Sequence, residues 1–202
     1  MISPFKKLSR LDIANFCNES RRRLSLIAIN SIDFEPVVKN CEDALICAEP
    51  LQQAFPSGYI HEPNFMGVQI PLVWDVNELL NTEMKVEIKD VPVPYLRNLM
   101  SPELFDDPYG PSFSQGPIIL AELPFCIPSA CILDGNHRVL DAIKRGFATL
   151  PAKLYYDHDH VNFMSPYSKV LFGACCNIFY ASLLVEDKIS VEDFNNLSFS
   201  LE

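Results

Sequence analysis

Residues 130–147 have the sequence ACILDGNHRVLDAIKRGF, and this stretch decides the fold that the chain is expected to adopt. Positions 130–133 are apolar throughout, which is typical of a short strand buried on both faces of a sheet. Asp134-Gly135 follows, and the apolar residues beyond it recur at the spacing of an amphipathic helix. These apolar positions are Val139, Leu140, Ile143 and Phe147. Gly146 suits the C-terminal cap. The stretch therefore predicts a buried strand, a tight turn and a helix that begins almost at once.

The flanking residues predict a small mixed sheet with helices around it. Strands are expected at 85–88, 91–94, 117–123 and 150–156. Ser165-Pro166 is an N-cap followed by proline, which predicts a helix that runs to Val185. Ser190 with Asp193 three residues later predicts a last short helix. The fold class is therefore α/β, or more loosely α+β.

The first part of the chain gives weaker patterns. One or two short helices are expected between Asp12 and Ile29, with Arg21-Arg22-Arg23 at their junction. Residues 49–71 are rich in proline and predict irregular backbone with short strands. We expect residues 1–84 to form an N-terminal extension that packs on a core made by residues 85–202 and its C-terminal helices.

Charge and cysteine usage limit the function classes. The net charge of −10 argues against non-specific electrostatic binding of nucleic acid. Any contact with DNA would be confined to a local basic cluster such as Arg21-Arg22-Arg23. The seven cysteines form no C-x-x-C pair and no framework of disulfides, which predicts a reducing, cytoplasmic location. The N-terminus lacks the apolar region of a secretory signal.

The apolar run 170–185 is shorter than the ~20 residues of a membrane-spanning helix. We expect a buried helix and no transmembrane segment. Peripheral contact with the inner membrane is the minor alternative.

The turn after the buried strand combines features of a phosphate site. Gly135 allows a tight turn and the close approach of a ligand, and the N–H groups at the start of a helix, including that of Asn136, attract an anion. Arg138 offers a planar fork of donors for phosphate oxygens, and His137 can transfer a proton near neutral pH. Asp134 is expected to orient Arg138 or to hold a metal ion that bridges phosphates. The alternative without a ligand is an ordinary strand-to-helix turn with a solvated arginine and with Asp134 as a turn residue.

Glu122 is a further candidate, because it would end a neighbouring strand and could serve as a general base. A surface charge is the more common role for such a residue. With Asp134 and His137 it completes the candidate catalytic set.

The central stretch resembles the sulfiredoxin/ParB N-terminal domain superfamily. The residues that carry the resemblance are Ile132-Leu133-Asp134-Gly135-Asn136-His137-Arg138, Ala142, Gly146 and Pro151-Ala152-Lys153-Leu154, with Asp90-Val91-Pro92-Val93 and Gln115-Gly116-Pro117-Ile118 upstream. The resemblance covers roughly residues 84–157. It implies that Gly135, His137 and Arg138 hold nucleotide phosphates.

Departures from that superfamily narrow the implied activity. Sulfiredoxins carry a catalytic cysteine where this chain has Asn136, and an amide cannot act as a thiolate nucleophile. Cys131, in the buried strand, is a poor substitute. The Glu-Arg-Arg string of the chromosome-partitioning branch is missing, and no helix-turn-helix is recognisable downstream. Sulfinic-acid reduction and centromere binding are therefore not expected.

The chain is also similar in size and acidity to plasmid fertility-inhibition proteins of the Osa kind, which act on conjugation machinery and with which ATPase and DNase activities are associated. This likeness implies a nucleotide-binding phosphohydrolase that uses ATP or another nucleotide, with Mg²⁺, and that inhibits conjugative DNA transfer through a type IV secretion system. Its partners would be a nucleotide, DNA and a protein of that machinery. The alternative is a non-catalytic inhibitor whose nucleotide site is vestigial or regulatory.

Overall fold

The computed structural model describes residues 7–52, 58–100, 104–105 and 116–201. The chain forms two compact units. The first, which we call the helical unit, joins Met1–Asp75 to Met164–Glu202, and the second, the sheet unit, is Val76–Phe163. The chain is thus α+β, as expected. The division differs from the expected one at residue 84, and the C-terminal helices belong with the N-terminal residues.

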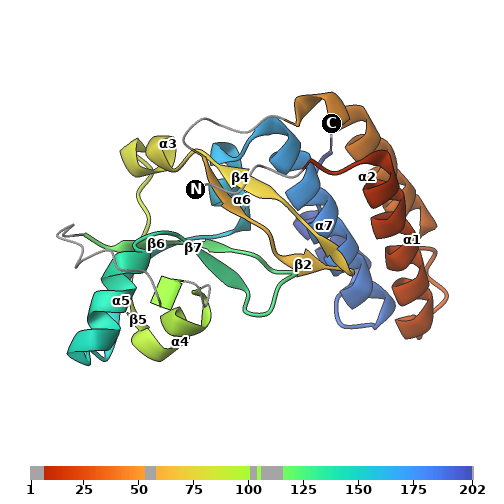
Figure 1. Ribbon diagram of the computed structural model, residues 1–202. Helices are drawn as coiled ribbons and strands as arrows, with labels where there is room; N and C mark the ends of the chain where they lie inside the picture. Colours follow the sequence, from red (N-terminus) through yellow and green to blue (C-terminus); the bar gives the residue numbers. More distant parts are fainter. Residues whose placement is uncertain (1–6, 53–57, 101–103, 106–115, 202) are drawn as a thin grey trace. The chain divides into compact units, whose positions relative to one another are not determined.

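The sheet unit contains the mixed sheet that the sequence predicts (Figure 1). Its elements are α3 (Val76–Asn81), β5 (Ile88–Pro92), α4 (Val93–Asn98), β6 (Ile118–Glu122), β7 (Ala130–Asp134), α5 (Asn136–Arg145), β8 (Thr149–Tyr155), α6 (Asp157–His160) and a 3-10 turn (Val161–Phe163). The strand order is β5-β8-β6-β7. Strands β6 and β8 are parallel, whereas β5 pairs with β8, and β7 with β6, in antiparallel fashion.

Helices α4 and α5 cover one face of this sheet. Leu96 of α4 and Val139 of α5 are fully buried against Ile118, Leu120 and Ile132 of β6 and β7. Burial of one such side chain contributes about 1.5–3 kcal/mol. This cluster anchors both the strand before the Asp134-Gly135 turn and the helix after it.

Two expectations for the sheet unit need correction at β5. Residues 85–87 are not part of a strand, and β5 begins at Ile88. The expected extended run 91–94 is divided, because Val93 and Pro94 open α4. Proline is favoured in a first helical turn, where its missing N–H would have no partner anyway.

The end of α5 also differs from the expectation. The helix stops at Arg145, and Gly146 takes a left-handed conformation with φ +71°. Phe147 therefore lies beyond the helix and is 50% exposed instead of facing the core. Farther along, Asp157–His160 forms a helical turn, α6.

The helical unit is built around helices α1 (Arg10–Ile27), α2 (Glu35–Ala48) and α7 (Pro166–Val185), which pack on one another (Figure 1). Its elements are α1 (Arg10–Ile27), α2 (Glu35–Ala48), a 3-10 turn (Glu49–Leu51), β1 (Tyr59–His61), β2 (Asn64–Phe65), β3 (Val68–Gln69), β4 (Leu72–Trp74), α7 (Pro166–Val185) and α8 (Val191–Leu197). The strands form two antiparallel pairs, β1 with β4 and β2 with β3.

Helix α7 has the predicted bounds, and the hydroxyl of Ser165 accepts a hydrogen bond from the amide of Ser168 at 3.3 Å. Among the described residues it is the helix that is long and apolar enough to cross a membrane by length and composition. In its most apolar window, 72% of the residues are buried inside the protein. The core helix of a water-soluble protein has the same character, so this helix is weak evidence for a membrane span.

Of the one or two short helices expected between Asp12 and Ile29, the structure has one, α1, and its 18 residues make it longer than expected. It is one continuous helix, and Arg21-Arg22-Arg23 lies within it rather than at a junction. Its start is fixed by a capping box, in which Ser9 and Asp12 bond reciprocally. Helix α2 was not predicted.

Candidate phosphate-binding site

The turn between β7 and α5 requires glycine for two reasons. Gly135 has φ +105°, a conformation that side chains disfavour. A Cβ atom there would also lie 2.6 Å from Cγ2 of Ile118 and 2.8 Å from Nη2 of Arg138. Both distances are too short for real contacts. Ile118 and the guanidinium group of Arg138 therefore pack directly against the backbone of Gly135 and leave no room for a side chain.

The guanidinium group of Arg138 is held by three acceptors. Nη2 donates to Oδ2 of Asp134 at 2.6 Å, and Nη1 donates to the carbonyl oxygens of Gly116 at 2.9 Å and Pro117 at 3.1 Å. The Arg138 side chain is only 11% exposed. Arg138 thus connects the residues before β6 to the end of β7. It is not a solvated arginine beside an ordinary strand-to-helix turn.

These contacts leave part of Arg138 available. Its Nε–H and its second Nη2–H have no acceptor among the described residues. They lie beside the start of α5, where no side chain caps the helix. The first backbone N–H groups of a helix have no intrahelical acceptor, and the helix dipole favours an anion beside them. The arrangement can therefore present a fixed cation and backbone donors to one anionic group.

The other predicted phosphate ligands occupy the same turn. Asn136 and His137 are the first two residues of α5, and both are half-buried. The structure thus brings Asp134, Gly135, Asn136, His137 and Arg138 together. Asp134 takes the orienting role that was one of its two expected functions.

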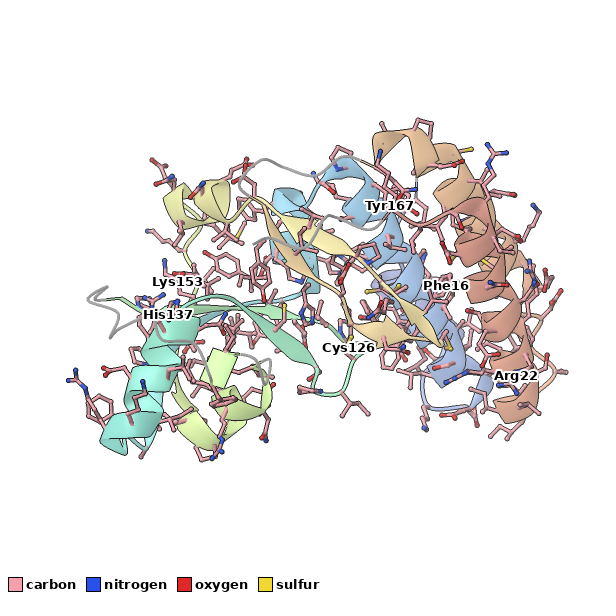
Figure 2. The ribbon with its side chains drawn as sticks, viewed as in Figure 1. Phe16, Arg22, Cys126, His137, Lys153 and Tyr167 are labelled. Carbon is pink, nitrogen blue, oxygen red and sulfur yellow. The ribbon has the colours of Figure 1, made fainter. Side chains whose placement is uncertain are left out.

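Lys153, which the sequence places on the strand after α5 and within the resemblance, is a further cation of the sheet unit. It pairs with Ile119, which in turn pairs with Asp134, so Lys153 and Asp134 lie two strands apart, about 10 Å. Figure 2 shows Lys153 and His137 at the same end of the sheet. Lys153 has no partner among the described residues. Its neighbour Ala152 packs against α4 and α5, so Lys153 points to the opposite face.

Glu122 is not brought to this turn. It pairs with Ala130 at the far end of β7, four residues before Asp134 and about 13 Å away. Figure 2 shows Cys126, which follows β6, at that same far end and well away from His137. The Glu122 carbonyl lies 2.8 Å from Nε2 of the buried His160. Glu122 therefore does not act on a phosphate bound beside Gly135.

No three His, Cys, Asp or Glu side chains converge to hold a metal ion in the part of the chain that the structure describes. Asp134 is the carboxylate at the turn, and it is already paired with Arg138. These residues do not form a Mg²⁺ site by themselves.

Cys131 is not a nucleophile that could replace the sulfiredoxin cysteine. It is fully buried in β7, and burial raises the pKa of its thiol well above the ordinary value. The thiolate, which is the reactive form, is therefore disfavoured.

The basic cluster on α1 is neutralised by carboxylates of the helical unit. Arg21 pairs with Glu35 at 2.9 Å and Glu42 at 2.7 Å. Arg22 and Arg23 both pair with Glu19 at 2.7 Å. Little uncompensated positive charge is left there for DNA.

Comparison with known proteins finds no matching family model, no matching curated protein and no matching solved structure.

Proposed function

We propose that the sheet unit binds the phosphate groups of a nucleotide, ATP or a related one, at the turn between β7 and α5. The observation that carries this proposal is the Arg138 guanidinium group, fixed by Asp134 and two carbonyls beside an uncapped helix start. A preorganised donor costs little to order when the ligand arrives. Free nucleotide is a better candidate than DNA, because the chain has a net charge of −10 and Arg21-Arg22-Arg23 is paired.

The proposed reaction is hydrolysis of the terminal phosphate. Water attacks the phosphorus atom, the bond to the bridging oxygen breaks, and His137 accepts the proton that water loses. Arg138 and the backbone N–H groups of α5 stabilise the negative charge on the phosphate oxygens, which is the main task in such chemistry. Asp134 keeps Arg138 in place. No step is assigned to Mg²⁺, and Glu122 has no role.

Binding is tested by calorimetry on the full chain with ATP, CTP and ADP, with and without Mg²⁺. Arg138→Gln should weaken binding about tenfold through loss of a charge-assisted contact. Arg145→Gln is the matched control, because Arg145 pairs with Asp141 at the same i,i+4 spacing at the other end of α5. If the two variants bind alike, Arg138 is not part of the site.

A second variant separates binding from folding. Asn136→Asp places a carboxylate at the first position of α5, which the helix dipole tolerates or favours but which repels phosphate. We expect unchanged thermal stability and at least about tenfold weaker binding. Full affinity in Asn136→Asp would refute a phosphate at this turn.

The second candidate function is a non-catalytic inhibitor. Two observations favour it. Arg138 is bonded within the protein to Asp134, and no group of three or more His, Cys, Asp or Glu side chains among the described residues could hold a metal ion. As an enzyme, the wild type releases phosphate from ATP and His137→Ala slows the release about a hundredfold. As an inhibitor of conjugation, it keeps its effect on cells in that variant. The conjugation setting and the protein partner come from the likeness to fertility-inhibition proteins, and the cytoplasmic location comes from the cysteine usage. All three belong to the proposal.

A further inference from the structure

A pocket of ≈ 640 Å³ lies between α4 and the end of α5 in the sheet unit. Its lining includes Val93, Pro94, Arg97, Asn98, Ile143 and Phe147. Helix α5 is ten residues long, about 15 Å, and the pocket is lined by residues at its C-terminal end, opposite the end that carries the phosphate site. It is a separate site.

One part of the pocket is apolar and open to solvent. Val93 forms its buried floor and Ile143 is half-buried. Phe147 is 50% exposed because the chain turns at Gly146 before reaching it. Aromatic side chains dominate the energetics of interfaces, and a large apolar group placed against Phe147 and Ile143 would remove both from water.

The other part of the pocket carries an uncompensated cation. Arg97 is exposed and has no carboxylate partner among the described residues. Its guanidinium carbon lies 5.5 Å from the centre of the Phe105 ring, a cation–π contact that helps to hold the group in place. Asn98 adds a side-chain amide, and no acidic residue is among the described residues that line the pocket. Most other arginines of the chain are paired, as Arg145 is with Asp141.

We propose that this pocket docks a segment of another protein that presents a carboxylate beside a large apolar side chain. The apolar side chain fills the space between Ile143 and Phe147, and the carboxylate meets Arg97 and the amide of Asn98. Arginine and aromatic side chains are both enriched at the energetic centres of protein interfaces. The proposal goes beyond nucleotide binding and does not depend on it.

The test uses the full chain and a fluorescein-labelled decapeptide with Asp-Phe-Asp-Leu at its centre and Gly and Ser around it. Binding is followed by fluorescence anisotropy at low ionic strength. We expect a Kd of roughly 0.1–1 mM, as befits a single small pocket. Arg97→Gln and Phe147→Ser should each weaken binding at least about fivefold, and a peptide with Asn-Phe-Asn-Leu should bind correspondingly less well.

Arg145→Gln is the matched control, since it removes an arginine that precedes the lining residue Gly146 and whose charge is already compensated by Asp141, and it should leave the affinity unchanged. Because Arg97 and Phe147 are exposed, thermal unfolding should show that their variants fold normally. No binding by the wild type, equal binding of the uncharged peptide, or loss of binding in Arg145→Gln alone would each overturn the proposal. Displacement of the peptide by ATP would also overturn it. So would wild-type self-association in sedimentation that Arg97→Gln abolishes, because the occupant would then be a second copy of this chain.

Discussion

Replacing Gly135 by alanine tests the construction of the candidate site most directly. The structure assigns two separate costs to the added methyl group. The first is backbone strain at φ +105°, which for a residue other than glycine is about 1–2 kcal/mol. The second is overlap with Ile118 at 2.6 Å and with Arg138 at 2.8 Å, which must be relieved by movement of a buried side chain and of the Arg138 clamp. Overpacking of this kind costs about 1–3 kcal/mol.

The free energy of unfolding of the sheet unit should therefore fall by about 2–5 kcal/mol. For a domain of this size the midpoint of thermal unfolding should fall by at least about 10 °C. Gly146→Ala is the control within the same unit. It has the strained backbone, at φ +71°, but a Cβ atom there meets nothing within 4 Å, so only the first cost of about 1–2 kcal/mol applies.

The measurement must report on the sheet unit. The only tryptophan, Trp74, lies in the helical unit, so tryptophan fluorescence does not follow unfolding of β7 and α5. Hydrogen exchange of peptides covering residues 130–145, as a function of urea, does. If Gly135→Ala loses no more stability than Gly146→Ala, the close packing of Arg138 against the turn is refuted.

Three further predictions concern the helical unit. Burial lowers the pKa of His61 from 6.5 to about 4, so the unfolded chain binds more protons than the folded chain between these values. The free energy of unfolding, followed by Trp74 fluorescence in urea, should therefore fall as the pH drops from 6.5 to 4, and a His61→Asn variant should show a smaller fall. Cys47 is exposed, whereas burial raises the pKa of Cys17 to about 12. Mass spectrometry after brief maleimide treatment should therefore find Cys47 modified well before Cys17. Equal rates of modification would contradict the burial of Cys17. The side chain of Asn177 donates a hydrogen bond to the carbonyl of Phe199 at 3.0 Å and accepts one from the amide of Phe199 at 2.7 Å. Asn177→Ala should therefore lower the free energy of unfolding in urea by about 1–3 kcal/mol. An unchanged midpoint would show that these two bonds do not stabilise the fold.

The parts of the fold that the sequence predicted best are those fixed by neighbouring residues. Strand β7, the glycine turn, the bounds of α7 and the capping box at Ser190 all depend on patterns within a few positions. Burial of an apolar strand and capping of a helix are local signals with strong physical causes. These expectations are confirmed.

The parts that failed have different causes. Only seven residues separate Glu122 from Ala130, which is too few for a parallel crossover, so an antiparallel pair with Glu122 at the far end of β7 from Asp134 could have been expected. The C-terminal helices join the N-terminal ones because α7 packs against α1 and α2, more than a hundred residues away in the chain, as the bond from Cys41 Sγ to the Ala174 carbonyl illustrates. Phe147 has helical spacing, but the left-handed Gly146 ends α5 before it. A pattern of neighbouring residues does not specify which distant segment of the chain a helix will pack against.

The same limit applies to Arg138, on which the two candidate functions divide. Its helical position and its closeness to Asp134 could be predicted, but its bonds to the carbonyls of Gly116 and Pro117 could not. Those bonds make Arg138 a structural clamp whether or not a ligand binds, because its guanidinium group is largely buried and needs acceptors there. Loss of activity in an Arg138 variant therefore does not by itself identify a phosphate ligand. Asn136→Asp does, since it changes the charge at the start of α5 and leaves the clamp intact. An inhibitor without a working nucleotide site would tolerate Asn136→Asp and fail with Arg138→Gln, whereas a nucleotide phosphohydrolase would be impaired by both.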